Sequence, residues 1–385
     1  MKKFFKVTLW FGLVVFLGVI IRISPYGYLF KGIKNTYLQG EASAHYTDWK
    51  GFETRRINSG NGVATKENPS KNKLSEELLQ MLNETESGSF LVYKNNELVS
   101  ENYFNKHEQS SITNSFSMAK TITALLVQKA IQEGYIKSWD ENVLNWLPWV
   151  QGEFANELTL RHLSTMTAGL KWRENYFAPL GITARAYYSD DVEGVMRSVI
   201  VETEPGKKWE YQSGATQFLG MVLMKALQSP PNGLKPYSQI SDFASAKLWG
   251  PLGMENDAQW SLDHKDGREL TFCCLNASSR DFGKLGLLVL NHGKWNGESI
   301  IDSAFLSLAS QSWKSINYGH SFWVSPSTEV PFYYYQGLKG QFIVIIPSEN
   351  MVIVRTGNGV KRKDKEYVFT CLRTYVSEGI RLFGR

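Results

Sequence analysis

The chain has 385 residues, of which 43% are hydrophobic and 21% are charged. This balance excludes a disordered polyelectrolyte and leaves enough apolar material for one large domain or two interleaved ones. The 42 Lys and Arg residues outnumber the 37 Asp and Glu residues, giving a formal charge of +5. All of this excess lies in the basic residues before Glu41, so residues 36–385 carry a net charge of −1. We therefore expect no nucleic-acid partner, since such a protein needs a basic face.

An apolar run from Val7 to Ile21 lies between Lys6 and Arg22. The run is shorter than the ~20 residues that span a bilayer, but a helix extended over residues 4–23 is long enough if its flanking basic side chains reach the two membrane surfaces. No small-residue cleavage sequence follows, which favours an uncleaved transmembrane anchor over a cleaved signal peptide within residues 1–23. Lysines on the N-terminal side predict that the rest of the chain is exported, to the periplasmic or extracellular side of a bacterial inner membrane.

Residues 24–74 are polar and rich in loop signals, which predicts a tether and lead-in. One large domain is expected over residues 75–385. It begins with a predicted helix from Leu74, followed by a β-hairpin whose strands at 90–93 and 97–99 flank the turn pair Asn95-Asn96.

The middle of the chain predicts a mostly helical insertion, over roughly residues 121–290. Its clearest element is an amphipathic helix over 116–133, which ends before Gly134. Later the pattern changes to strands at 341–346 and 351–354, and a closing helix is predicted over 367–382. Strands at both chain ends with helices between them predict an α/β fold with one sheet completed by both ends.

Neither a metal site nor another cofactor is expected. The six histidines form no pair at the spacing of metal ligands, and no Gly-rich phosphate loop is present. The three cysteines, Cys273, Cys274 and Cys371, are an odd number with two adjacent, which implies no disulfide framework. Burial as small hydrophobic side chains is the favoured interpretation.

The pattern Ser-x-x-Lys occurs twice, at Ser70–Lys73 in the polar lead-in and at Ser117–Lys120 at the start of the amphipathic helix. In the helix, the i,i+3 spacing places both side chains on one face. The helix N-terminus favours negative charge on the serine oxygen, and a desolvated lysine can accept its proton. An N-capping serine beside a surface lysine would give the same pattern.

Two further motifs follow in order. Tyr211-x-Ser213 precedes an apolar helix, and a tyrosine beside a Ser/Lys pair can relay protons to a leaving group if neighbouring cations lower its pKa. The stretch 335–341 contains glycines that let a substrate lie against a strand edge, and the Leu338 N–H could complete an oxyanion hole with that of Ser117. The ordinary alternatives are a packing ring at Tyr211 and a plain turn at 335–341.

Together, Ser117-x-x-Lys120, Tyr211-x-Ser213 and Tyr335-Gln336-Gly337 resemble the serine β-lactamase and penicillin-binding-protein superfamily. The resemblance is strongest to its class C β-lactamase-related branch and to 6-aminohexanoate-dimer hydrolase-like proteins. Further matching stretches at 160–170 and 249–254 stand in the same order, so the resemblance covers about residues 75–385.

The resemblance implies a three-layer α/β (α+β) sandwich with an antiparallel sheet, plus a mostly helical domain, with the site in the cleft between them. It implies Ser117 as the nucleophile, Lys120 as base or proton shuttle, and Tyr211 as general acid/base. The residues it places at the substrate are Ser213, Gln336, Gly337 and Leu338. From its position in a polar loop, Tyr176 is a further candidate to line the substrate cleft.

Two positions depart from the family pattern. Ser213 stands where β-lactamases usually carry Asn, and Tyr335 stands where they and penicillin-binding proteins usually carry Lys, which disfavours binding of a β-lactam carboxylate. The sequence therefore predicts an exported serine hydrolase that cleaves a small-molecule amide or ester. A penicillin-binding-protein-like cell-wall peptidase and a catalytically idle binding protein on the same fold remain alternatives, and the oligomeric state is open.

Overall fold

The computed structural model describes residues 10, 19, 20, 22, 24–325, 329–359 and 365–384. The predicted anchor over residues 1–23 therefore lies almost entirely outside the described residues. Within the described ranges, no helix is both long and apolar enough to cross a membrane.

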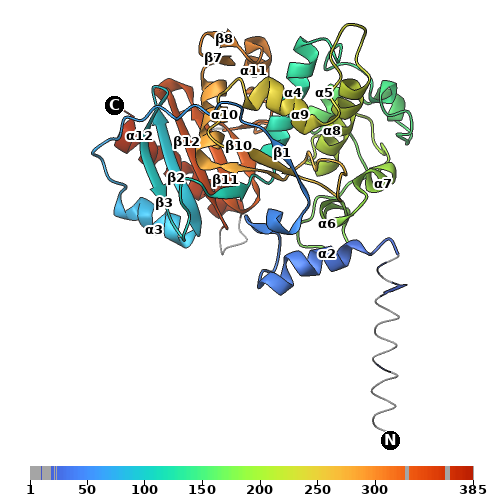
Figure 1. Cartoon of the computed structure of the whole chain (residues 1–385), viewed down its shortest axis with the longest axis horizontal. Coiled ribbons are helices and arrows are strands. Elements are labelled where there is room, and N and C mark those ends of the chain that lie inside the picture. Colours follow the sequence, from blue (N-terminus) through green and yellow to red (C-terminus); the bar gives the residue numbers. More distant parts are fainter. Residues whose placement is uncertain are drawn as a thin grey trace, which may run out of the picture.

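The larger sheet is antiparallel and takes strands from both ends of the chain, as predicted (Figure 1). Its hairpin turns at Asn95 and Asn96, whose φ angles of 52° and 67° suit a tight turn with both central residues left-handed. In spatial order the strands are β3 (Glu97–Tyr103), β2 (Ser87–Lys94), β12 (Met351–Gly357), β11 (Gln341–Ile346), β10 (Tyr333–Gly337) and β9 (Trp323–Val324).

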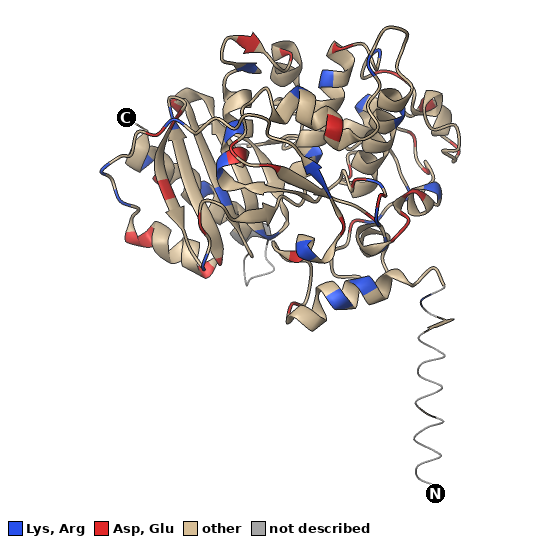
Figure 2. Ribbon diagram, in the orientation of Figure 1, with Lys and Arg blue, Asp and Glu red and all other residues tan. Residues whose placement is uncertain are grey.

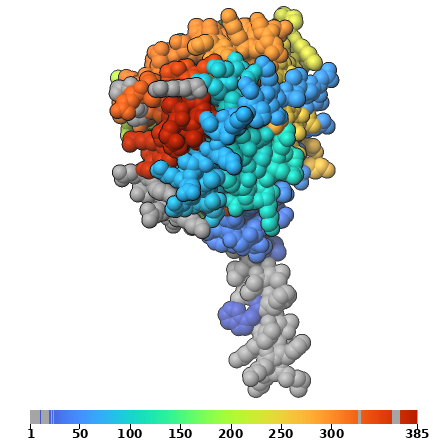
Figure 3. All heavy atoms as spheres, turned by 90° about the vertical axis from the view of Figure 1, so that its left-hand side faces the viewer, coloured from blue at the N-terminus to red at the C-terminus, as the bar shows by residue number. Residues whose placement is uncertain are grey.

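Helices cover both faces of this sheet, so successive strand residues alternate between two apolar clusters. Phe90 and Val344 pack with α3 (Glu76–Glu84) and α12 (Lys365–Phe383), whereas Leu91 and Ile343 pack with α4 (Met118–Gln132) and α10 (Ser279–Leu290). Figure 3 shows the outer face, where the C-terminal helix lies beside the first helix of the domain. This is the predicted three-layer arrangement of an antiparallel sheet between helical layers.

The predicted helix over 116–133 is α4, and Gly134 follows it with a φ of 82°. The rest of the insertion is mostly helical, as predicted, and forms the second half of the molecule (Figure 1). Its further helices are α5 (Leu160–Ser164), α6 (Ile182–Tyr188), α7 (Val192–Arg197), α8 (Ser213–Gln228) and α9 (Ile240–Ala244), and it ends with α10. The small hairpin of β7 (Lys294–Trp295) and β8 (Glu298–Ser299) follows the insertion, and α11 (Ser303–Ala309) comes after the hairpin.

A second antiparallel sheet lies between the two halves, and the sequence analysis did not predict it. Its strands are short and come from the lead-in, the insertion and the segment before Ser117. In spatial order they are β1 (Thr54–Ile57), β5 (Ala258–Ser261), β6 (Leu275–Ser278) and β4 (Ile112–Asn114). This sheet positions the site, because β4 runs directly into the turn that carries Ser117.

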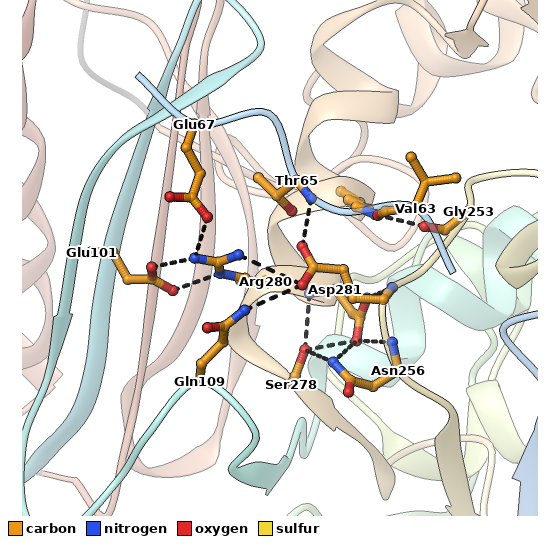
Figure 4. Close-up of polar contacts among 12 residues, drawn as sticks. Val63, Thr65, Glu67, Glu101, Gln109, Gly253, Asn256, Ser278, Arg280 and Asp281 are labelled. Atoms are coloured by element: carbon orange, nitrogen blue, oxygen red, sulfur yellow. Dashed lines mark hydrogen bonds and ion pairs between the residues drawn. The ribbon is translucent and has the colours of Figure 1, made fainter. Parts of the chain in front are cut away.

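The segment predicted as a tether is folded onto the domain. It forms α2 (Tyr28–Asn35) beside α6, then β1, and then an extended strap (Figure 1). Figure 4 shows how the strap is held: the Thr65 N–H donates to Glu255 at 2.7 Å, and Arg280 pairs with Glu67 at 2.8 Å while also binding Glu101. Arg280 is only 5% exposed, so these ion pairs are better shielded from water than surface pairs.

Charges of both signs are interspersed over the two halves of the described molecule (Figure 2). In this view both halves of the described ribbon carry red as well as blue segments. This distribution agrees with the near-neutral charge of residues 36–385 and gives no support to a polyanionic partner.

Candidate active site

Ser117 stands at a strained turn between β4 and α4. Phe116 has a φ of 45°, a left-handed conformation that costs a bulky residue ~1–3 kcal/mol. The turn is stabilised by the Phe116 N–H, which donates to the Asn114 side-chain oxygen at 2.8 Å. Ser117 occupies the N-cap position of α4, yet its hydroxyl caps no N–H of the described helix. The N-capping alternative is therefore wrong, and the serine oxygen faces the helix N-terminus unengaged by the backbone.

Lys120 lies one turn along α4 and points back at Ser117. Its Nζ donates to Ser117 Oγ at 3.0 Å and to the Phe272 carbonyl at 2.8 Å. The residue is 1% exposed, and burial lowers the pKa of Lys120 to about 8, while the nearby Glu174 carboxylate acts in the opposite direction. A lysine with this pKa is neutral in about one molecule in ten at neutral pH and can then accept a proton.

Tyr211 and Ser213 reach the same place because the chain between them is extended. Gln212 has a φ of −139° and a ψ of 111°, so its neighbours on either side point the same way. The Tyr211 phenol interacts with the Ser117 side chain, and its ring lies 5.1 Å from Lys120 Nζ. Burial raises the pKa of Tyr211 far above its usual value, against the smaller opposing effect of Ser117, so the phenol keeps its proton and its pKa is not lowered as the relay role required.

Glu174 organises this side of the site, and the sequence analysis missed it. Its carboxylate accepts from the Ser213 N–H and hydroxyl, both at 2.7 Å, and from the Trp172 indole at 2.7 Å. Tyr176, which is 39% exposed, interacts with Glu174 through its hydroxyl. Burial of that hydroxyl and the Glu174 charge hold the pKa of Tyr176 well above its usual value. The one sequence signal was an acid between aromatic residues in the 172–177 loop.

The end of β10 brings Gly337 and Leu338 close to the turn that carries Ser117. The Gly337 backbone lies so close to the Ser115 carbonyl that an added Cβ would be 2.2 Å from its oxygen. Leu338 lines the same cavity as Ser117. Gln336 does not line this cavity, in contrast to the prediction. Side chains alternate along β10, so Gln336 lies on the same sheet face as its paired residue Phe342, which packs toward α12. Tyr335 is fully buried, and its hydroxyl has no partner among the described residues.

A largely apolar cavity of about 160 Å³ adjoins Ser117. Its floor includes Ser117, Ser213, Phe272 and Leu338, and Tyr176 stands in its wall. None of the described residues that line it carries a charged side chain. Much of the remaining wall comes from α2 and the residues after it, a segment that the sequence analysis treated as a tether.

Two of the three cysteines depart from the interpretation as plain hydrophobic side chains. Cys273 and Cys274 are buried, as predicted, but they form a disulfide with each other. Cys273 also lines the cavity, directly after the Phe272 carbonyl that binds Lys120. Cys371 lies on α12 and is buried in the apolar cluster between this helix and the sheet. Within the described ranges, no group of His, Cys, Asp and Glu side chains has the arrangement of a metal site.

Comparison with known proteins agrees with this geometry. The family model described as Beta-lactamase matches residues 76–370. An uncharacterized protein of Alkalihalophilus pseudofirmus is 23% identical over 331 residues, covering 74% of this chain and 90% of the relative.

Two solved structures show the same fold at low identity. One is a Bacillus anthracis protein named as a candidate 6-aminohexanoate-dimer hydrolase, with a TM-score of 0.76 and 20% identity over 88% of this chain and 93% of that one. The other is a D-stereospecific amidohydrolase from Streptomyces, with a TM-score of 0.58 and 16% identity over 77% of this chain and 97% of that one. The family model covers well over half of the sequence, and the chain therefore belongs to the Beta-lactamase family.

Proposed function

We propose that this protein is a serine hydrolase that cleaves an amide or ester bond through an acyl intermediate on Ser117. The observation that carries the proposal is the buried Lys120 amine, 3.0 Å from Ser117 Oγ, with the Tyr211 phenol interacting with the same serine side chain. A serine hydroxyl that lies beside a buried amine and a phenol, in the lining of a cavity, has the arrangement of an activated nucleophile.

The two pKa shifts divide the roles between Lys120 and Tyr211. Neutral Lys120 accepts the Ser117 proton as Oγ bonds to the substrate carbonyl carbon and the C=O electrons move onto oxygen. Tyr211 keeps its proton because burial raises its pKa, so it serves as a donor to the leaving nitrogen or oxygen and is reprotonated from Lys120. Water then attacks the acyl-Ser117 carbonyl, and the reverse proton transfers release the acid and restore the serine.

The N–H groups of Ser117 and Leu338 are our candidates for the oxyanion hole. The close approach of Gly337 to the Ser115 carbonyl supports this, since it brings the Leu338 backbone to the start of α4. Donors fixed in this way stabilise the tetrahedral oxyanion, and loss of one such donor costs other serine hydrolases ~10²–10³-fold in rate.

The rate of Ser117 acylation is expected to rise with pH around a midpoint of about 8. Burial lowers the folded-state pKa of Lys120, so the neutral, proton-accepting form is lost as pH falls through that value. The measurement is the rate of fluorophosphonate labelling across neutral and mildly alkaline pH. A rate that stays constant over this range would show that Lys120 is not the base.

Replacing Glu174 by Gln is expected to move this midpoint to lower pH. The Glu174 carboxylate raises the pKa of Lys120 against the effect of burial, and the amide removes the charge while keeping much of the shape. The measurement is the rate of fluorophosphonate labelling against pH for the wild type and for Glu174→Gln. Comparing the midpoints of the two curves separates the pKa shift from any change in the overall rate. A shift toward higher pH would contradict this electrostatic account.

We further propose that the chain is held at a membrane by residues 1–23, with the hydrolase domain on the exported side. The apolar run between Lys6 and Arg22 and the cluster of basic residues at the N-terminus support this. We expect the full chain to stay with sedimented membranes after an alkaline carbonate wash, and a chain beginning at residue 24 to be released. Recovery of the full chain in the supernatant would overturn this part of the proposal.

A further inference from the structure

The cavity beside Ser117 has a wall that lies outside the family domain. The family match begins at residue 76, whereas α2 and the loop after it contribute Tyr28, Leu29, Ile33, Tyr37 and Ala44 to the lining. The facing wall comes from the loop before α6 and from α6 itself. The space next to Ser117 is therefore shaped in part by an N-terminal segment that lies outside the residues matched by the family model.

Specific contacts hold α2 in place. The Tyr28 hydroxyl donates to the Pro179 carbonyl at 3.0 Å, and Lys31 pairs with Asp190 at 3.3 Å. Gly32 lies against the Tyr188 ring, where a Cβ would sit 3.3 Å from the nearest ring atom. These contacts hold α2 against α6 and so fix its position in the cavity wall.

The same N-terminal segment is linked to the nucleophile turn. Asp48 is 3% exposed, and its carboxylate accepts from the Tyr187 hydroxyl at 2.8 Å and from the Asn114 amide at 3.1 Å. The oxygen of that Asn114 amide accepts the Phe116 N–H, one residue before Ser117. These hydrogen bonds connect Asp48, which follows α2, with Tyr187 on α6 and with the turn before Ser117. They therefore fix the position of the cavity wall relative to Ser117.

The chemistry of the lining indicates what the cavity binds. Its volume of about 160 Å³ is small compared with the ~300–1,000 Å³ pockets of drug-sized ligands. Its described residues offer hydrocarbon and aromatic surface, a few hydroxyl groups and no charge. A charged group placed there would be desolvated without a partner, whereas a slim hydrocarbon chain would be favourably buried.

We propose that residues 28–44 form a substrate-binding wall of this active site, and that the cavity holds the slim, uncharged hydrocarbon part of an amide or ester whose carbonyl is attacked by Ser117. This inference rests on the proposed hydrolase function. It assigns selectivity to a segment before the family domain and excludes substrates that place an ammonium or carboxylate group in the cavity.

The test uses the full chain in lipid nanodiscs, so that detergent does not fill the cavity. Two ester series are compared, one lengthened from acetate to hexanoate on the acyl side and one lengthened by the same methylenes on the alcohol side. Each buried methylene is expected to raise kcat/KM about fourfold, or roughly 10²-fold along the series on the side that enters the cavity.

Ile33→Asp then places a charge in the wall. Ile33 is 45% exposed, so the substitution is compatible with folding. The ratio of kcat/KM for the longest to the shortest ester should fall at least ~10-fold, because the chain would share the cavity with a carboxylate. Ile33→Leu should keep the ratio. Phe30→Asp is the matched control, since Phe30 lies on the same helix, is 41% exposed and does not line this cavity.

The outcomes separate the two proposals. A wild-type protein that hydrolyses both series without chain-length preference, or an Ile33→Asp variant with an unchanged ratio, overturns the assignment of the wall while leaving the hydrolase intact. A ratio that falls equally in Phe30→Asp also overturns it, since the effect would not belong to the cavity. Absence of any Ser117-dependent hydrolysis and labelling would overturn the proposed function, and this inference with it.

Discussion

Replacing Ser117 by Ala is expected to lower kcat/KM for any ester or amide substrate by at least ~10⁴-fold, and to abolish labelling by a fluorophosphonate. The substitution removes the oxygen that forms the acyl bond, and loss of a nucleophile of this kind removes nearly all of the chemical rate enhancement. Fold and cavity should survive, because the described Ser117 hydroxyl makes no helix cap. The measurement is steady-state hydrolysis together with probe labelling of wild type and variant.

The chain supplies a control for this substitution in its second Ser-x-x-Lys sequence. Ser70 lies on the exposed strap, and among the described residues its hydroxyl accepts a local hydrogen bond from the Asn72 N–H at 3.1 Å. Ser70→Ala should therefore leave turnover and labelling unchanged. Substantial activity in Ser117→Ala, or its loss in Ser70→Ala, would contradict the assignment of the nucleophile.

Replacing Lys120 by Arg should lower kcat/KM by ~10²–10⁴-fold, the range that a general base contributes. An arginine stays protonated at every accessible pH, so it cannot take the Ser117 proton. Its guanidinium must also fit where the compact amine reaches Ser117 Oγ and the Phe272 carbonyl. The loss should appear both in turnover and in the rate of probe labelling, and it should persist at alkaline pH.

Lys284 is a matched control because it is another buried lysine, 3% exposed, with a pKa lowered by burial. Its Nζ donates to the Val63 and Gly253 carbonyls, whereas the Nζ of Lys120 donates to Ser117. Lys284→Met should lower the free energy of unfolding by ~1–3 kcal/mol, as unpaired buried carbonyls do, while kcat per folded molecule stays unchanged. A Lys120→Arg protein as active as wild type would remove Lys120 from the mechanism.

Much of the fold could be predicted because its elements carry strong local patterns. The hairpin at Asn95-Asn96, the stripe of α4 and the apolar strands β11 and β12 follow from turn chemistry and periodicity. The grouping of the candidate catalytic residues also has local causes. A helical i,i+3 spacing brings Ser117 to Lys120, and extended backbone at Gln212 turns Tyr211 and Ser213 to the same side.

The parts that escaped prediction depend on contacts between distant segments. The four-stranded sheet is built from strands of three or four residues, too short for a periodic signal. The role of Glu174 depends on its hydrogen bonds to Ser213, a residue far from it in the sequence. The position of α2 likewise depends on its contact with the distant Pro179. Gln336 was placed at the substrate by resemblance, whereas the pleat of β10 directs it to the other face of the sheet.

The cavity lining also helps to judge the alternative that the protein is a penicillin-binding-protein-like cell-wall peptidase. Penicillin-binding proteins and β-lactamases usually carry a lysine where this chain has Tyr335, which is buried here with an unpaired hydroxyl among the described residues. The described lining of the cavity offers no cation for a substrate carboxylate. These features favour a neutral amide or ester over a β-lactam or a peptide with a free C-terminus.

The most direct test of the account is intact mass spectrometry of the full chain after brief exposure to a fluorophosphonate, followed by peptide mapping. A phosphonate bonded to the nucleophile is not released as an acyl group is, so the adduct accumulates. We predict one adduct for each protein molecule, located on Ser117 and absent in Ser117→Ala. An adduct on another residue, or none in a preparation that hydrolyses an ester, would contradict the assignment of Ser117 as the nucleophile.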